Sequence, residues 1–546
     1  MSSWFVPEGR PMIVYRALPE LLHRAGLPVV FGLTGSSNVA WLGYGVQKGL
    51  IEFRRTRHEG TAVAAAAGYA RASGRVGVAS VTLGPGFANA VNALAAAVHQ
   101  HAAVLLMVGE SPSQQHFGLQ NVEQRRIAEA LGAGYHLVGS AAELAPEFER
   151  ALDAVSRDGT PQVLSIPDDI LGSETPLPDG RRTPLPDLPA PEPAAVAAAV
   201  DVLAAARRPL VLAGQGASLA GCRNELVELS RLCGARLATT LNVHRFFAGE
   251  PNDLGACGHS SPAEVLEQLH HTDAVLSVGA SMNEFTTGNG SIFPKATIVQ
   301  CEIDEDQRFV ASAPELGLLG DAAVTLRRLI AEWRGRGLGP PPPVTGLPRR
   351  VDIRRRLLTV DLGHDPARGL DPRAVLATMD DVLPEDRIVV ADGGRSGALL
   401  SAIVDARDGR SWISSRGHGS IGLGLGAALG AAAAHPDRLV TLFCGDAGFL
   451  MTAQELDAVR LNRAYLLIVV LDDGQHGSEL AFLDAYGLPH DIARQDTPDL
   501  VALARAYGGD GCELRDEGDL EAFSPPTSGL FIARAVIDPL VNGRHV

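Results

Sequence analysis

The sequence predicts an α/β protein with three doubly wound parallel-sheet domains. Short, continuously apolar runs alternate with alanine-rich helical segments along the chain, as is typical of parallel strands that are buried on both faces. Two proline-rich stretches, 175–193 and 337–348, predict extended linkers. The 546 residues suffice for three domains, which we expect at 1–174, 190–337 and 366–546.

Each predicted domain contains apolar runs that should form its buried strands. These runs are 28–33, 76–84 and 104–110 in the first domain, 209–214, 273–280 and 296–304 in the second, and 387–394, 438–446 and 465–474 in the third. Helices are expected over 60–74 and 87–100. Ligands of such sheets bind outside the carboxyl ends of the strands, so the chemistry should lie there.

The composition narrows the possible partners and location. A formal net charge of −16 argues against nucleic acid or an anionic membrane as the main partner. No apolar stretch reaches the roughly 18 residues of a membrane span, and the first residues do not resemble a signal peptide. The six cysteines form no C-x-x-C pair, so we expect reduced core residues in a cytoplasmic protein.

Two acids follow consecutive apolar runs in the third domain. One run ends at Gly445-Asp446, and the next ends at Asp-Asp-Gly, with Asp473 as the second acid. Neighbouring parallel strands would bring both acids to one sheet edge, where carboxylate and carbonyl oxygens suit Mg²⁺ bound to a phosphate. The alternative from spacing alone is that both acids only cap turns or helices. Between them, Thr452 and Glu455 predict a capping box at a helix start.

A glycine-rich stretch precedes these strands and allows a second interpretation. Its glycines would let the backbone approach a bound group, and the following helix N-terminus would face an anion. Gly424, Gly426 and Gly430 also match G-x-G-x-x-x-G, with Asp446 at 20 residues after Gly426, which favours a nicotinamide-dependent dehydrogenase. That fingerprint should follow a strong strand, and only the short run 411–414 precedes it.

Several motifs in the same order resemble the signature of thiamine diphosphate enzymes. The stretch from Asp446 to Asp473 is similar to G-D-(G/A)…(N/D)-(N/D)-G, residues 55–71 resemble R-H-E-x-x-A, and residues 82–94 resemble S-G-P-G-x-x-N. Over nearly its full length the chain resembles acetolactate synthase and its 2-oxo acid decarboxylase relatives. The resemblance implies a pyrimidine-binding, a central and a diphosphate-binding domain, in that order.

The resemblance also implies which residues hold the cofactor. Glu59 would keep a proton on the aminopyrimidine ring, which then acts as the base at C2. Mg²⁺ would be held by Asp446, Asp473 and the backbone carbonyl of Gln475, and Ile421 would bend the cofactor into a V shape. Further cofactor contacts are implied for Gly394, Arg395, Ser396, Gly419, Gly445, Ala447 and Gly448. Outside this family, Glu59 would be a helix N-terminal charge and Ile421 an ordinary core residue.

Arg395 and Ser396 stand where acetolactate synthases carry a Gln-His pair on the phosphate side. An arginine there would add direct charge pairing with the diphosphate.

Other residues are expected to act on the substrate. Gln120 matches a glutamine near the substrate, and His116 falls where decarboxylases of this superfamily carry histidines, which suit proton transfer near neutral pH. His418 and Glu479 are further candidates. Glu479 lies six residues beyond Asp473, an offset at which the pyruvate decarboxylase branch has a glutamate, and it would donate a proton during aldehyde release. Each of these residues is equally open to an ordinary surface role.

The departures from the pattern point away from branched-chain biosynthesis. Here G-D-G is G-D-A and Asn-Asn is Asp-Asp, but an extra carboxylate should still bind Mg²⁺. Residues 279–288 replace the Arg-Phe-Asp-Asp-Arg run that is associated with FAD in biosynthetic acetolactate synthases, so we expect no FAD.

The function implied is an acetolactate synthase-like carboligase that depends on thiamine diphosphate and Mg²⁺. It would decarboxylate a 2-oxo acid and transfer the acyl carbanion equivalent to a small-molecule acceptor. The alternatives are a simple decarboxylase that releases an aldehyde, a non-catalytic homologue, or the dehydrogenase. Because the family's cofactor lies between subunits, the resemblance implies a homodimer or homotetramer. The net charge leads us to expect neither nucleic acid nor a membrane as partner.

Overall fold

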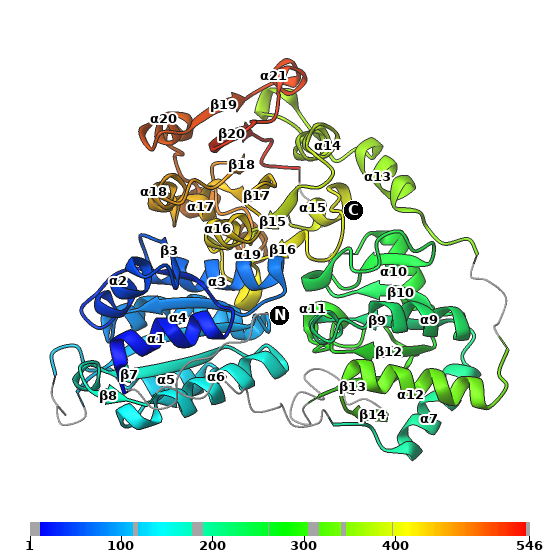
Figure 1. Cartoon of the computed structure of the whole chain (residues 1–546). Helices are drawn as coiled ribbons and strands as arrows, with labels where there is room; N and C mark the ends of the chain where they lie inside the picture. Colours follow the sequence, from blue (N-terminus) through cyan, green and yellow to red (C-terminus); the bar gives the residue numbers. More distant parts are fainter. Residues whose placement is uncertain are drawn as a thin grey trace.

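A computed structural model describes residues 11–112, 118–176, 189–259, 261–303, 316–339, 345–395 and 397–541. The described chain forms three α/β domains, each built on a six-stranded parallel sheet (Figure 1). This architecture confirms the predicted fold class. Among the described helices, none combines the length and the apolar character that crossing a membrane requires.

The N-terminal sheet has the strand order β3-β2-β4-β5-β7-β6. Its strands are β2 (Val29–Gly32), β3 (Glu52–Arg55), β4 (Gly77–Val81), β5 (Val104–Glu110), β6 (Gly134–Leu137) and β7 (Gln162–Pro167). One face packs on α1 (Val14–Arg24), α2 (Val39–Gln47) and α6 (Leu144–Asp158), and the other on α3 (Glu59–Ser73), α4 (Pro85–His99) and α5 (Gln124–Ala130). A short antiparallel pair, β1 (Met12–Ile13) and β8 (Glu174–Thr175), lies beside this sheet.

The central sheet has the order β11-β10-β9-β12-β13-β14. Its strands are β9 (Pro209–Ala213), β10 (Arg236–Thr239), β11 (Asp253–Ala256), β12 (Ala274–Val278), β13 (Thr297–Glu302) and β14 (Leu316–Leu319). Its helices are α7 (Pro193–Ala205), α8 (Gln215–Leu219), α9 (Arg223–Cys233), α10 (Ala263–His270), α11 (Glu284–Thr287) and α12 (Ala322–Gly335).

The C-terminal sheet has the order β16-β15-β17-β18-β20-β19. Its strands are β15 (Ile388–Ala391), β16 (Trp412–Ser414), β17 (Val440–Gly445), β18 (Leu466–Asp472), β19 (Asp510–Leu514) and β20 (Leu530–Val536). The helices from the linker onward are α13 (Arg350–Thr359), α14 (Pro372–Val382), α15 (Gly397–Ile403), α16 (Gly424–Ala434), α17 (Asp446–Leu450), α18 (Leu456–Leu461), α19 (Leu480–Ala485), α20 (Leu500–Ala506) and α21 (Glu517–Ala522). Short 3₁₀ turns include η6 (Gly417–Gly419), η7 (Ala453–Glu455) and η8 (His490–Ala493).

Helices α3 and α16 join the N-terminal and C-terminal domains into one hydrophobic core (Figure 1). They approach so closely that a Cβ at Gly68 would lie 2.1 Å from the carbonyl oxygen of Ala427, and one at Gly430 would lie 1.9 Å from that of Ala65. Only glycine fits at such backbone contacts. Two glycines of the G-x-G-x-x-x-G pattern, Gly426 and Gly430, therefore face α3. The close packing of the two helices explains why glycine is needed at these positions.

The predicted capping box is wrong. Thr452 precedes η7, but its hydroxyl donates to the carbonyl of Gly422 at 3.0 Å and makes no cap. The Glu455 carboxylate instead accepts the backbone N–H of Arg57 in the N-terminal domain. Both side chains that the local pattern assigns to the helix start are therefore used in contacts with distant segments, Thr452 within the C-terminal domain and Glu455 with the N-terminal domain.

Candidate active site

A pocket opens at the carboxyl ends of β15, β17 and β18, where sheets of this kind bind ligands. Strands β17 and β18 pair in parallel, so Asp446 and Asp473 reach the same sheet edge, as the sequence predicts. The pocket encloses about 730 Å³ of space, counting the part open to solvent. Many of the expected site residues line it, namely Gly394, Arg395, Ile421, Gly445, Asp446, Ala447, Gly448, Asp473, Gln475 and Glu479.

Asp446 is almost completely buried at the start of α17. Its Oδ2 accepts hydrogen bonds from Gln495 Nε2 at 2.6 Å and from Thr497 Oγ1 at 3.0 Å. Burial raises the pKa of this carboxyl, and the nearby Asp472 raises it further, while the hydrogen bond from Gln495 opposes the shift. Sequence reasoning missed Gln495 and Thr497, which no local motif marks.

Asp473 forms a buried ion pair with Arg395. Arg395 Nη2 lies 2.5 Å from Asp473 Oδ2, and Arg395 Nη1 donates to the carbonyl of Pro539 at 2.8 Å. Burial raises the pKa of Asp473 to about 6; Arg395 works against this shift and Asp446 adds to it. In this chain Arg395 therefore contacts an acid of the expected metal site, so its contact with a diphosphate stays a prediction.

Gln475 adds oxygen and nitrogen atoms to the same edge. It pairs with Arg494 in an isolated antiparallel bridge whose hydrogen bonds use Gly474 O and His476 N. The carbonyl of Gln475 therefore points away from that bridge. Its side-chain Nε2 is buried and finds no partner among the described residues. A buried polar atom without a partner is costly, and a bound polar group would satisfy it.

These donors fit a magnesium ion. Two buried carboxylates with raised pKa values and a backbone carbonyl that points away from the strand bridge are hard oxygen ligands, and a cation would relieve the repulsion between the carboxylates. Within the described ranges, no group of three or more His, Cys, Asp or Glu side chains is placed to hold a metal. This site would thus depend on waters or phosphate oxygens to complete an octahedral shell.

The loop with Ile421 is organised by Asp392, a buried acid that sequence reasoning missed. Its carboxylate accepts the backbone N–H groups of Gly422 at 2.9 Å and Gly424 at 3.2 Å, and the Ser415 hydroxyl at 2.8 Å. A Cβ at position 393 would lie 2.8 Å from Ile421 Cγ2, so the residue after Asp392 must be glycine for Ile421 to stand there. These contacts place Ile421 on the pocket wall.

Glu59 belongs to a second group of residues, on the N-terminal domain. It begins α3, is 9% exposed, and accepts a hydrogen bond from Asn89 Nδ2 at 3.0 Å. Gln120 is exposed and approaches the start of α4, where a Cβ at Gly84 would lie 2.1 Å from its carbonyl oxygen. Glu59 and Gln120 thus both lie beside the start of α4, apart from the described residues that line the pocket.

The remaining expected residues lie elsewhere or outside the described chain. His418 and Gly419 do not appear among the described residues of the pocket wall. The His418 ring is exposed and stacks on His99, with centroids 5.1 Å apart. His116 and Ser396 lie outside the described residues.

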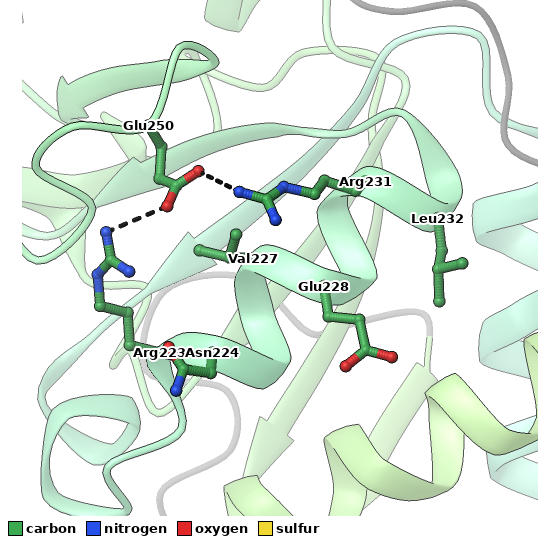
Figure 2. A pocket seen from close by; sticks show the side chains of 7 residues that line it. All are labelled: Arg223, Asn224, Val227, Glu228, Arg231, Leu232 and Glu250. Carbon is green, nitrogen blue, oxygen red and sulfur yellow. Dashed lines mark hydrogen bonds and ion pairs between the residues drawn. The ribbon is translucent and has the colours of Figure 1, made fainter.

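A second concave region lies along α9 of the central domain (Figure 2). Glu250 stands between two arginines, at 3.3 Å from Arg223 and 2.9 Å from Arg231. Arg223 also donates to the backbone carbonyls of Phe246 and Ala248. Both arginines are thus already paired, and none of the predicted site residues lines this region, in contrast to the strand-end pocket at β15, β17 and β18.

Three models of known protein families match this chain, one in each of the three domains. Residues 12–130 match the N-terminal TPP binding domain of thiamine pyrophosphate enzymes, residues 196–329 match the central domain, and residues 392–523 match the C-terminal TPP binding domain. Thiamine pyrophosphate (TPP) is another name for thiamine diphosphate. The fold and the order of the matches define a thiamine pyrophosphate enzyme.

Curated relatives extend this similarity over most of the chain. An acetolactate synthase large subunit of Parasynechococcus marenigrum is 30% identical over 528 residues, 92% of this chain and 83% of that protein. A probable 2-ketoarginine decarboxylase of Pseudomonas aeruginosa is 30% identical over 523 residues, 93% of this chain and 89% of that protein. A sulfoacetaldehyde acetyltransferase of Rhodobacter capsulatus is 27% identical over 495 residues, 86% of this chain and 83% of that protein. The chain belongs to the acetolactate synthase and 2-oxo acid decarboxylase superfamily of thiamine diphosphate-dependent enzymes.

Proposed function

We propose that this enzyme requires Mg²⁺ with thiamine diphosphate, decarboxylates a 2-oxo acid and transfers the remaining acyl unit to a small-molecule acceptor. The observation that carries the proposal is the placement of Asp446 and Asp473 at adjacent strand ends, in one pocket with Arg395 and Gln475. The range of reactions named for its relatives supports the class of chemistry.

The pocket supplies the groups that a diphosphate–magnesium unit needs. When bound, thiamine diphosphate supplies a carbon nucleophile and an electron sink. Asp446, Asp473 and the carbonyl of Gln475 would hold Mg²⁺, which in turn would bind the diphosphate. The backbone of Gly445–Gly448 and Gly394 would approach the phosphates, and Ile421 would support the bend of the cofactor.

Glu59 would hold a proton at the ring nitrogen of the aminopyrimidine. Its buried carboxylate already has one oxygen bonded to Asn89 and the other beside Gly86, where a Cβ would lie 3.6 Å from Oε1. Asn89 thus orients the acid, and Gly86 leaves space in front of it. A low-polarity setting strengthens such a hydrogen bond.

We place Glu59 and the pocket of one working site on two different chains. The described wall of the pocket consists of residues between 392 and 479, none of them from the N-terminal domain. Beyond Glu479, an apolar surface is left exposed, with Phe482 63%, Tyr486 78%, Leu488 52% and Ile492 84% accessible. A second copy of the chain would cover such a surface and bring its own Glu59 to the pocket. The proposal therefore requires a homodimer or homotetramer.

Release of an aldehyde is the second candidate reaction. Glu479 and His476 line the pocket near its mouth, and both are exposed, so either has access to solvent protons. A proton donor at that place favours release of the product over transfer to an acceptor. The relative named as a probable decarboxylase is consistent with this route.

Two further expectations follow from residues outside the pocket. We expect no FAD requirement, because residues 279–288 lack the arginine-containing run of the biosynthetic enzymes. We also expect a cytoplasmic location, in keeping with six free cysteines of which five are buried.

The test is carbon dioxide release from a panel of 2-oxo acids, with thiamine diphosphate and Mg²⁺ each present or withheld, and with the organic product identified by mass. Release that needs both from one acid, together with a product longer than the donor's acyl unit, supports the proposal. An aldehyde as the only product would select the second candidate reaction. Absence of release from every acid, with the cofactor shown to bind, would overturn decarboxylation.

A further inference from the structure

We propose that Glu455 is a positioning residue for Glu59. Its carboxylate, on the C-terminal domain, holds in place the loop of the N-terminal domain at residues 55–61, which runs from the end of β3 into the first turn of α3 and includes Glu59. The inference rests on the proposed function, because the placement of Glu59 affects catalysis only if the chain uses thiamine diphosphate.

Glu455 is a completely buried acid at the contact between the two domains, at 0% exposure. Its Oε1 and Oε2 both accept the backbone N–H of Arg57, at 3.1 and 2.9 Å. The backbone N–H of His58 and the hydroxyl of Thr61 also lie near enough to this carboxylate to lower its pKa. These donors stand on both sides of Glu59 in the chain, so one carboxylate fixes the backbone before and after that residue.

The neighbouring residues hold the same loop against the same domain. Asn462 Oδ1 accepts the N–H of Arg55 at 3.2 Å, and its Nδ2 donates to the carbonyl of Arg55 at 2.8 Å. Within the loop, His58 Nδ1 accepts the N–H of Gly60 at 3.0 Å and caps α3. Among the residues of the C-terminal domain that hold this loop, Glu455 is the most buried. Its bonding partner Arg57 is also closer to Glu59 in the sequence than Arg55, the partner of Asn462.

A carboxylate is required there because all of its named partners are donors. An ionised glutamate offers only acceptor atoms. A glutamine, or a protonated glutamic acid, would direct a hydrogen toward a donor and lose at least one of the bonds to the loop. The backbone N–H of Arg57 or His58 would then be left without its acceptor, which costs free energy.

The ionisation of Glu455 falls near neutral pH. Burial raises its pKa to about 7, and the N–H of Arg57, the Thr61 hydroxyl and the N–H of His58 oppose the shift. The charged or titratable groups around it are Arg57, His58 and Glu59 on the loop, and Asp457 and Arg460 on α18. Arg57 and Arg460 both pair with Asp457, whose single negative charge offsets one of their two positive charges, and the charge of Arg57 lowers the pKa of Glu455. Above pH 7 the carboxylate holds the loop fully, and below pH 7 it does so less.

The experiment compares the wild-type enzyme with Glu455→Gln by two readouts. Hydrogen exchange at pH 8 reports the protection of the backbone amides of Arg57 and His58. Turnover is measured from pH 5.5 to 9 with the 2-oxo acid that the panel identifies. We expect exchange at these amides to become at least tenfold faster, kcat at pH 8 to fall at least tenfold with KM little changed, and the acid limb near pH 7 to disappear.

Asp457→Asn is the matched control, because Asp457 contacts the side chain of Arg57 and not its backbone N–H. It should leave the limb near pH 7 in place. If Glu455→Gln does not fold, Thr61→Val removes one donor and should raise exchange at His58 more mildly. Unchanged exchange at Arg57 and His58, or a retained acid limb in Glu455→Gln, would overturn the proposal. Wild-type enzyme without cofactor-dependent turnover would instead overturn the proposed function, and the exchange data would still decide whether Glu455 holds the loop.

Discussion

Arg395 and Asp473 form a buried ion pair in the wall of the strand-end pocket, with 2.5 Å between Nη2 and Oδ2 and only 10% of each side chain exposed. The family pattern often has asparagine at position 473 and a Gln-His pair at 395–396, so two replacements coincide in this chain. The extra negative charge and the extra positive charge neutralise each other. The net charge of the site therefore stays close to that of a site with asparagine at position 473 and Gln-His at 395–396.

Replacing Arg395 with glutamine should destabilise the enzyme when Mg²⁺ is absent. Asp473 would stay buried beside Asp446 without its counter-charge, which costs about 3 kcal/mol for a buried pair that loses one partner. Mg²⁺ should recover more of the lost Tm in this variant than it adds to the wild type. Thermal unfolding with and without Mg²⁺ measures both effects.

Arg494→Gln is the control, because Arg494 pairs with Asp491 on the surface, where the side chains are 70% and 81% exposed. It should change Tm by less than a degree or two. An equal loss in both variants would mean that the buried pair contributes nothing particular to the site.

The buried strands of the sheets could be predicted from the sequence, but the strands at the edges of the sheets could not. Strands such as β5 and β18 are buried on both faces and read as continuous apolar runs. The edge strands β3 and β6 have the sequences EFRR and GYHL, whose polar residues face partly outward, and no apolar run marks them. Their place in the sheet depends on pairing with distant strands, which one sequence does not reveal.

The residues of the candidate site could likewise be predicted only in part. Asp446 and Asp473 could be predicted because each directly follows an apolar run, and neighbouring strands must bring them together. Asp392 and Gln495 could not, since they act through contacts with segments 23 to 49 residues away in the chain. The ion pair of Arg395 with Asp473 likewise joins residues 78 positions apart.

Replacing Gly430 with alanine should strongly destabilise the contact between α3 and α16. The new Cβ would lie 1.9 Å from the carbonyl oxygen of Ala65, so the helices must separate, and overpacking of this kind costs about 1–3 kcal/mol. Urea unfolding gives the free-energy change. Gly43→Ala in α2 is the control, because nothing lies within 4 Å of that position, and it should be neutral or slightly stabilising. Equal behaviour of the two variants would contradict the close helix contact.

The stability of the wild type should fall as pH rises through Glu455's ionisation. Its folded pKa of about 7 lies above the ordinary 4.5, so the folded state binds the proton more tightly than the unfolded state. The stabilisation that comes from this tighter proton binding is therefore fully present below pH 4.5. It is lost by about pH 7, which lowers the free energy of unfolding by about 3 kcal/mol. Glu455→Gln does not titrate, so its stability relative to wild type should rise between pH 5 and pH 8. Urea unfolding at both pH values measures the difference, and parallel pH dependence of the two proteins would contradict the buried ionisation.

Glu479→Gln should distinguish aldehyde release from acyl transfer. If Glu479 donates the proton, the variant should lose aldehyde formation about 10²-fold, because general acid catalysis contributes on that order. Formation of a carboligated product should fall much less. Product ratios by mass spectrometry, with and without an added acceptor, provide the measurement. His476→Gln is the comparison, since His476 lines the same wall. An unchanged ratio in Glu479→Gln would assign the glutamate to the surface.

Mixing two inactive variants should restore activity if each site uses two chains. Glu59→Gln removes the acid of the N-terminal domain, and Asp446→Asn removes a metal ligand of the C-terminal domain. In a mixed dimer, one site combines both defects and the other combines an intact Glu59 with an intact Asp446. Because about half of the dimers are mixed and each has one working site, about a quarter of wild-type turnover should return.

The measurement is carbon dioxide release after the two proteins are unfolded together and refolded, or co-expressed with different tags and purified as the mixed species. Asp446→Asn mixed with Asp473→Asn is the control, because both changes lie in the same pocket and no combination of chains contains an intact one. Recovery in the first mixture and not in the second would place Glu59 and the pocket of one site on different subunits. Failure of the first mixture, with mixed dimers shown to form, would place them on the same chain.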